Sequence, residues 1–238
     1  PRQYGHKCVS VQLPYIVASR ATPALAENLL RDEHPILLQG IHCTYLLNDA
    51  RFAARKVIVR LFNTEYLYYE QLCKSTSPVS LFKKLYYHRE SRVLRQYEQQ
   101  IIDKALFLAL SEQDVNHYRQ VFQAKKIAHL PPLLPYSEVN GKEGMGCFCL
   151  FHGNLSVAEN ERAALWLMEE VFNDLAVPFV IAGKNPSKKL ERTAQNQRQT
   201  CVVANPSEEE LQDMISKAQI NVLPSFICTG IKLKLLNA

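Results

Sequence analysis

The sequence predicts an α/β fold with two domains, each containing a parallel sheet flanked by helices. Short apolar runs alternate with amphipathic stretches along the 238 residues, a pattern typical of repeated strand–helix units. The alternation is interrupted once, in the segment 131–145, which combines three prolines with two glycines. We therefore expect one Rossmann-like domain over residues 1–135, a second over residues 136–238, and a ligand cleft between them.

The first half is predicted to alternate strands and helices from its start to the proline-rich segment. Apolar residues recur at helical spacing across residues 80–105, which indicates one long amphipathic helix. Ser111 precedes a further helix, and residues 111–114 fit a capping box in which the hydroxyl and the carboxylate satisfy free backbone N–H groups. The expected strands are 7–13, 35–41, 56–62, 106–110 and 126–130, and the expected helices are 19–33, 45–54, 65–74, 80–105 and the one after Ser111.

The second half repeats the alternation. Acidic residues after Pro206 and Ser207 indicate the start of one helix, because carboxylates are favoured at helix N-termini. The last helix is expected to begin at Ile231. The expected strands are 146–152, 178–182, 200–204 and 220–223, and the expected helices are 158–172, 187–194, 206–218 and 231–238.

The composition is that of a globular protein, with 47% hydrophobic and 21% charged residues. The sequence contains no run of about 18 uncharged apolar residues, so no transmembrane helix is predicted. Residues 1–135 hold 18 Lys and Arg against 11 Asp and Glu, whereas residues 136–238 hold 10 against 12. The basic first half suits an anionic acceptor or a peripheral contact with an anionic membrane surface, unless its charges form an ordinary solvated face.

Seven cysteines are present, most of them inside apolar strand-like runs. An odd number in such positions indicates reduced thiols in a cytosolic protein and not a disulfide framework. Cys147 and Cys149 share one face of a strand, but no second pair completes a tetrahedral site, so no metal is expected.

Three glycines of the second half, Gly153, Gly183 and Gly230, each follow a predicted strand and precede a helix. Ligands of open α/β sheets bind beyond the carboxyl ends of the strands, where a glycine lets a phosphate approach the backbone. The helix that follows offers free N–H groups. No G-x-G-x-x-G motif is present, and each glycine alone fits a tight turn. The three together indicate a ligand site at one edge of the sheet.

The end of the chain resembles the donor-site element of retaining GT-B glycosyltransferases of the group 1 or family 4 type. Val222-Leu223-Pro224-Ser225 is similar to a strand that ends at Pro-Ser, and Gly230-Ile231-Lys232-Leu233-Lys234 is similar to the glycine loop and helix that follow it. In that family the N-terminus of the helix binds the donor diphosphate.

The resemblance extends over nearly the whole chain. Phe151-His152-Gly153-Asn154-Leu155 and Phe179-Val180-Ile181-Ala182-Gly183-Lys184 resemble two strand–loop pairs of the donor domain. Residues 201–218 resemble the segment that places the nucleobase, and residues 109–114 the last strand–helix unit of the acceptor domain. The resemblance implies a GT-B fold with an acceptor-side domain over 1–135 that lacks its first strand and a nucleotide-sugar donor domain over 136–238 that lacks its end.

For the donor site, the resemblance implies that Lys232 and the helix N-terminus stabilise the leaving diphosphate. Thr229 and Asn237 occupy the positions of two acidic residues that flank this element, and Asn237 stands where a glutamate holds the ribose. The implied donor-binding residues are Gly153, Asn154, Gly183, Lys184, Thr229, Gly230, Ile231, Lys232 and Asn237.

On the acceptor side, Gln39, Gly40 and His42 lie at the end of one predicted strand, and Asn63 and Glu65 at the end of the next. These positions look like the acceptor-side loops of the family. His42 and Glu65 are candidates to orient an acceptor hydroxyl or to act as a weak base. The alternatives are a hydrogen-bonded loop histidine and a glutamate at a helix N-terminus.

The resemblance implies a retaining hexosyltransferase that moves a sugar from a nucleoside-diphosphate sugar to a glycan or glycolipid hydroxyl, in bacterial surface polysaccharide synthesis. It also implies a cytoplasmic protein, at the inner face of the membrane where the acceptor is a lipid, with no cofactor besides the donor. A sugar-nucleotide epimerase of the same fold and a non-catalytic two-domain ligand-binding protein stay open as alternatives. Nucleic acid is not an expected partner, because no recognised binding module is present.

Overall fold

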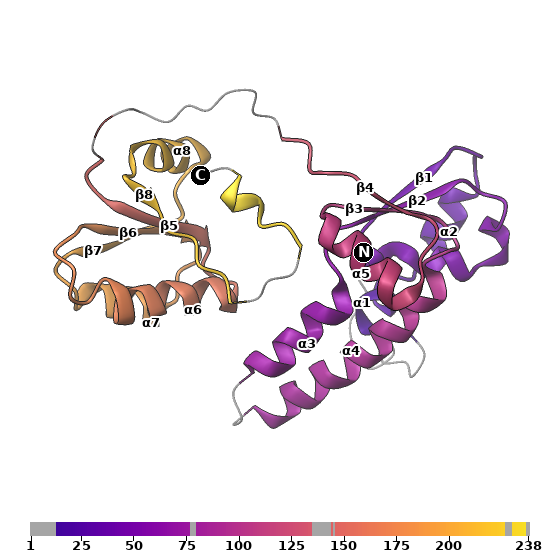
Figure 1. Cartoon of the computed structure of the whole chain (residues 1–238), viewed down its shortest axis with the longest axis horizontal. Helices are drawn as coiled ribbons and strands as arrows, with labels where there is room; N and C mark the ends of the chain where they lie inside the picture. The colour runs from indigo at the N-terminus through magenta and orange to yellow at the C-terminus, as the bar shows by residue number, and fades with distance from the viewer. Residues whose placement is uncertain (1–12, 77–79, 135–143, 145, 227–229, 237–238) are drawn as a thin grey trace. The chain divides into compact units, whose positions relative to one another are not determined.

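The computed structural model describes residues 13–76, 80–134, 144, 146–226 and 230–236. The chain divides into two compact units, Pro1–Leu133 with Thr229–Ile231 and Leu134–Cys228 with Lys232–Ala238. Each unit contains a four-stranded parallel sheet flanked by helices (Figure 1), so the predicted fold class is confirmed. Within the described residues, no helix is long and apolar enough to cross a membrane.

The sheet of the first unit has the strand order β1-β2-β3-β4, and all its neighbours are parallel. Its apolar residues alternate along the strands, and Val59, Leu61, Phe107 and Ala109 are buried in the core. The expected strands of this half are confirmed, except that residues 7–12 of the first lie outside the described part of the chain. The strands are β1 (Ile36–Gln39), β2 (Val57–Leu61), β3 (Leu106–Ala109) and β4 (Ile127–His129).

The helix expected over 19–33 is shorter in the structure, where α2 covers only Pro23–Leu29, so its predicted bounds are wrong. A separate short helix, α1 (Tyr15–Ala18), ends before residue 19. Pro23 is the first residue of α2, and Thr22 before it is extended, with φ −121° and ψ 131°. Proline disfavours the α conformation in the residue that precedes it and fits only the first turn of a helix. A single continuous helix therefore cannot pass through this point without strain.

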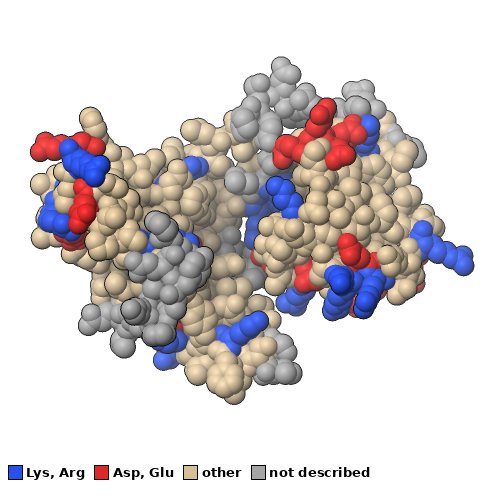
Figure 2. Space-filling model, turned by 180° about the vertical axis from the view of Figure 1, so that it is seen from behind, with Lys and Arg blue, Asp and Glu red and all other residues tan. Residues whose placement is uncertain are grey.

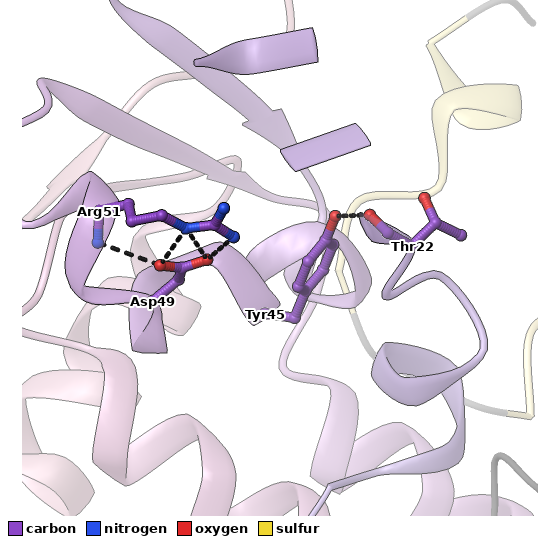
Figure 3. Close-up of polar contacts among 4 residues, drawn as sticks. All are labelled: Thr22, Tyr45, Asp49 and Arg51. Atoms are coloured by element: carbon purple, nitrogen blue, oxygen red, sulfur yellow. Dashed lines mark hydrogen bonds and ion pairs between the residues drawn. The ribbon is translucent and has the colours of Figure 1, made fainter. Parts of the chain in front are cut away.

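The α-helix expected over 45–54 is replaced by 3-10 helices at Ile41–Asn48 and Ala50–Phe52. Asp49 interrupts the segment in an extended conformation, and its carboxylate accepts the Arg51 N–H at 3.0 Å and pairs with the Arg51 guanidinium (Figure 3). Aspartate side chains compete in this way for backbone N–H groups. Tyr45 donates its hydroxyl to the Thr22 carbonyl at 3.0 Å and so ties this segment to the start of α2.

Two helices, α3 (Glu65–Ser75) and α4 (Leu81–Ile101), form a hairpin that projects from the sheet of the first unit (Figure 1). Tyr69 and Tyr87 make an edge contact between them, with ring centroids 6.0 Å apart. The inner part of α4 buries Leu94, Tyr97 and Ile101, whereas its first turn and a half, residues 81–86, is exposed. The hairpin is thus anchored at one end only.

Glu98 of α4 caps the N-terminus of α3, since its carboxylate accepts the Tyr66 N–H at 3.0 Å and the Tyr118 hydroxyl at 2.7 Å. Tyr118 belongs to α5 (Glu112–Phe122), where the Ser111 hydroxyl accepts the Asp114 N–H at 3.1 Å as predicted. The other half of the predicted capping box is wrong. The Asp114 carboxylate accepts the hydroxyls of Ser111 and Thr64 and not a backbone N–H group.

The sheet of the second unit has the strand order β7-β6-β5-β8, again all parallel. Helices α6 and α7 cover one face and α8 the other (Figure 1), over separate apolar clusters. α6 continues as a π-helix at Leu167–Val171, within the helix expected over 158–172. The elements are β5 (Cys149–Asn154), α6 (Ala158–Trp166), β6 (Phe179–Lys184), α7 (Lys188–Gln195), β7 (Thr200–Ala204), α8 (Glu208–Lys217) and β8 (Ile220–Asn221).

The strand order of the second unit reverses between β5 and β8. From β5 the chain moves outward to β6 and β7, and it then returns to pair β8 with the other side of β5, through Cys149 and Ile220. The carboxyl ends of two such strands diverge into loops on opposite sides of the sheet, which leaves a crevice where ligands of open α/β sheets bind. This switch point is where the sequence predicts a ligand site.

The α-helix expected from Ile231 is not formed in the described residues 230–236. They contain a 3-10 helix at Leu233–Leu235, closed by a 2.9 Å hydrogen bond from the Leu235 N–H to the Lys232 carbonyl. An α-helix needs several consecutive turns to offset the cost of its first one. The predicted N-terminal anion site of that helix is therefore missing from the described segment.

Candidate functional site

The second unit gathers polar side chains at the carboxyl ends of β5 and β8. Glu159 and Asn160 lie in the first turn of α6, directly after β5. The segment that follows β8 contacts the same turn, since the Ser225 hydroxyl donates to Glu159 Oε1 at 2.8 Å and Lys232 Nζ lies 3.2 Å from that oxygen. Residues about 70 positions apart in the sequence thus meet at the switch point.

Lys234 adds a second ammonium group to this cluster. Its Nζ donates to Asn160 Oδ1 at 3.2 Å and lies 5.1 Å from the centre of the buried Phe151 ring. Burial lowers the pKa of Lys234, the Glu159 carboxylate opposes this effect, and the charge of Lys232 adds to it. Two ammonium groups beside the positive end of α6 form a site suited to an anion.

His152 lies in β5 next to this cluster and is 4% exposed. Its Nε2 has no hydrogen-bond partner among the described residues. Burial, and secondly the charge of Lys234, lower the pKa of His152, which keeps the imidazole neutral at pH 7. Sequence reasoning missed His152, Glu159, Asn160 and Lys234 as site residues, although each lies within a few positions of a glycine or lysine that it did select.

Gly153 and Gly183 are paired in register on neighbouring strands. A Cβ atom built on Gly183 would lie 1.9 Å from the Gly153 carbonyl oxygen, so packing alone requires a glycine there. A Cβ atom on Gly153 would lie 3.2 Å from Asn160 Nδ2, so the glycine lets the Asn160 side chain pack closely against the end of β5. Gly230 has a φ of 63°, a left-handed conformation that favours glycine.

The other predicted donor residues differ in their placement. Asn154 ends β5, and its side-chain oxygen accepts the N–H and the hydroxyl of Ser156 at 3.1 and 2.7 Å, so that oxygen is already used. Lys184 is exposed at the end of β6, while Gly230 and Ile231 group with the first unit. Thr229 and Asn237 lie outside the described residues.

In the first unit, Gln39 is the last residue of β1, and Gly40 and His42 follow it. Gly40 has a φ of 88°, and a Cβ atom there would lie 2.4 Å from Cε1 of His42. The imidazole therefore folds back over the end of β1, against the backbone of Gly40. Asn63 follows β2, and its Oδ1 is buried with no hydrogen-bond partner among the described residues.

Glu65 is the first residue of α3, just beyond β2. Burial raises the pKa of Glu65 to about 7, and the positive charge of Arg20 opposes that rise. Arg20 is held by a 2.8 Å hydrogen bond from Nη1 to the Ile16 carbonyl. Burial raises the pKa of the nearby Cys43 thiol, and the charge of Arg20 opposes that rise as well. A carboxyl group with a pKa near neutrality can exchange a proton with a substrate hydroxyl. Arg20 was not selected from the sequence.

Charged residues of both signs are interspersed on the face drawn in Figure 2, over both units. The surplus of basic residues in the first half does not form one continuous basic surface on that face of the described residues.

The cluster lies in a part of the chain that matches a known family. Residues 147–238 match the family model "Glycosyl transferases group 1". An uncharacterised 44.6 kDa protein of the cps region of Klebsiella pneumoniae is 28% identical over 243 residues, a match that covers 95% of this chain and 60% of that protein. The chain thus spans less than two thirds of the relative's length.

Solved structures show the same architecture. The crystal structure of TarM matches with a TM-score of 0.57 at 11% identity, over 85% of this chain and 38% of TarM. A variant of S. aureus TarM, in complex with Fondaparinux, alpha-GlcNAc-glycerol and UDP, matches with a TM-score of 0.50 at 13% identity, over 77% and 34% of the two chains. The fold that the resemblance implies is confirmed: the chain has the GT-B fold, and its residues 147–238 match the group 1 glycosyltransferase model.

Proposed function

We propose that the protein is a glycosyltransferase that moves a sugar from a nucleoside-diphosphate sugar to a hydroxyl acceptor, with retention of the anomeric configuration. The observation that supports this most is the convergence of Lys232 and Lys234 on the first turn of α6, at the switch point of the second unit. The family match over residues 147–238 covers the same cluster.

The donor diphosphate would bind between the two ammonium groups and the N-terminus of α6. Negative charge grows on the diphosphate as the bond to the sugar breaks. Lys232 and the positive end of α6 would stabilise that charge. The helix terminus in this proposal is that of α6, in place of the chain-end helix expected from the sequence. The proposal requires no cofactor besides the donor.

The first unit, over residues 1–135, would bind the acceptor. Glu65 has a pKa of about 7 and stands at the carboxyl edge of the sheet, so it would accept a proton from the acceptor hydroxyl. His42 and Asn63, at the ends of β1 and β2, would orient that hydroxyl.

The cps region of the Klebsiella pneumoniae relative supports a role in bacterial surface polysaccharide or glycolipid synthesis. UDP in the TarM complex makes UDP-sugars the first donors to test. A lipid-held acceptor would bring the protein to the inner face of the membrane.

The direct test incubates the full-length protein with UDP-sugars and a panel of glycan and glycolipid acceptors, and follows the products by NMR. A product with the donor's anomeric configuration is expected. An inverted product would contradict retention, and isomerisation of the donor without an acceptor would contradict transfer and favour the epimerase. Lys232→Ala, which removes a proposed diphosphate contact, should lower the yield of product. Lys217→Ala is its matched control, because Lys217 is an exposed lysine of the same unit, paired with Asp213 at 2.6 Å.

A further inference from the structure

The outer end of the α3–α4 hairpin exposes four large apolar side chains in the first turn and a half of α4. Leu81 is 68% exposed, Phe82 90%, Leu85 64% and Tyr86 39%. Positions 81 and 85, and positions 82 and 86, are one helical turn apart, so the four form two adjacent rows on one side of the helix. Single exposed apolar residues are common, but a contiguous group at the tip of a projection marks a contact surface.

The same end of the hairpin is basic. From Gln71 to Arg89 the sequence contains four Lys and Arg residues and no Asp or Glu. Two of these cations are paired, Lys74 with Glu70 at 3.3 Å and Arg89 with Glu90. Lys83 and Lys84 are exposed, and no acidic side chain of the described residues pairs with them. Two free ammonium groups thus directly follow the most exposed aromatic side chain.

We propose that this end of the hairpin docks on an anionic lipid bilayer. Leu81, Phe82 and Leu85 would enter the boundary between headgroups and acyl chains, and Lys83 and Lys84 would extend to lipid phosphates. Helices that lie at a membrane surface combine apolar residues of this kind with Lys and Arg on the neighbouring faces. The inference deepens the proposed function, since it places a glycosyltransferase beside lipid-held acceptors, and it rests on that function for the choice of partner.

Charge favours a bilayer over a second copy of the chain as the occupant. Two copies that met through this surface would bring their unpaired lysines together, and like charges at short range repel. Four side chains are also far fewer than the roughly 20–30 residues a side of a stable protein interface. An anionic bilayer offers both an apolar layer and the opposite charge.

The test measures co-sedimentation of the full-length protein with vesicles of phosphatidylcholine alone, or of phosphatidylcholine with phosphatidylglycerol, without any sugar donor. Binding is expected only to the anionic vesicles and should weaken with salt. Each basic residue near an anionic surface strengthens binding by about fivefold, so reversal of both charges in Lys83→Glu/Lys84→Glu should weaken it by about 25-fold or more. Phe82→Ser should also weaken binding to the anionic vesicles, by removing the most exposed of the four apolar side chains.

Lys188→Glu/Lys189→Glu is the matched control, because these two exposed lysines are also adjacent in a helix, α7 of the second unit. Its binding should stay within about twofold of the parent protein for the docking surface to be specific. Equal binding to neutral vesicles, no binding, or unchanged binding of the Lys83/Lys84 variant would overturn the proposal. So would self-association that Phe82→Ser abolishes without any vesicle binding. Nucleotide binding by the second unit is measured separately, so failure of the docking surface is distinct from failure of the proposed function.

Discussion

Replacing Glu98 by glutamine should remove a large part of the pH dependence of the first unit's stability. The Glu98 carboxyl group is fully buried and accepts the Tyr66 N–H at 3.0 Å and the Tyr118 hydroxyl at 2.7 Å. Burial raises its pKa from 4.5 to about 8, the two hydrogen bonds oppose that rise, and the charges of Glu65 and Asp114 add to it. The folded protein therefore holds a proton at Glu98 that the unfolded chain releases at lower pH.

The magnitude follows from that difference. Between pH 4.5 and about 8 the folded state binds more protons than the unfolded state, so stability falls as the pH rises through this window. Each pKa unit corresponds to about 1.36 kcal/mol, which gives a loss of about 4 kcal/mol by the upper end of the window. That is a large share of the roughly 5–15 kcal/mol that stabilises a typical domain. Glutamine keeps the shape and can accept the Tyr66 N–H, but it does not ionise.

The assay is urea unfolding across this pH range, followed by circular dichroism, with the emission of the single tryptophan, Trp166, as a separate record of the second unit. We expect the parent protein to lose stability with rising pH and Glu98→Gln to lose about 4 kcal/mol less. The remaining loss would come from Glu65, whose pKa is about 7, and from Glu90, whose pKa burial also raises. Glu70→Gln, an exposed change on α3, is the control and should keep the parent slope. A Glu98→Gln protein with the parent slope would refute the reasoning.

Three further changes test the site. Gly183→Ala should destabilise the second unit by about 1–3 kcal/mol, measured by urea unfolding with Trp166 emission. The new Cβ would lie 1.9 Å from the backbone oxygen of Gly153, which cannot rotate away as the end of a side chain can. Glu159→Gln should tighten nucleoside diphosphate binding about threefold to tenfold in calorimetry, because the carboxylate that now pairs with Lys232 at 3.2 Å competes with the phosphates. Glu65→Gln should lower the transfer rate and remove the rise of kcat/KM with pH around pH 7, where the pKa of Glu65 lies.

Each of these changes has a contradicting result, and the first two have a matched control. Lys188→Ala, an exposed change in α7 of the same unit, should unfold like the parent. A neutral Gly183→Ala would show that β5 and β6 can separate freely. Glu169→Gln, an exposed change in the π-helix, is the control for Glu159→Gln and should leave nucleotide affinity unchanged. Weaker nucleotide binding by Glu159→Gln would show that the Glu159 carboxylate contributes to binding and does not compete with it. A Glu65→Gln protein with the parent pH profile would remove Glu65 from proton transfer.

Local patterns predicted most of the strands and helices, because buried strands such as β2 and β3 require the apolar runs that define them. The errors have local causes that compete with periodicity. Pro23 sets the start of α2 four residues later than expected, and Asp49 caps a 3-10 turn inside another expected helix. The Glu98 cap on α3 joins residues 32 positions apart, which no local pattern contains.

The sequence also predicted part of the candidate site. Glycines after strands located the carboxyl edge of the second sheet, and the resemblance selected Lys232. The contact of Lys232 with Glu159 joins residues 73 positions apart and depends on β8 pairing with β5, which is a property of strand order and not of either segment. The catalytic and binding roles assigned to His42, Glu65 and the donor residues remain predictions.

The most direct test of the central claim, that the second unit holds a nucleoside diphosphate on Lys232, is calorimetric titration of the full-length protein with UDP and with GDP. A charge-assisted contact to phosphate contributes about 1.5–3 kcal/mol, so Lys232→Ala should bind about 10- to 100-fold more weakly than the parent, while Lys217→Ala binds like the parent. If Lys232→Ala binds the nucleotide as tightly as the parent protein does, the donor site lies elsewhere and the account is wrong.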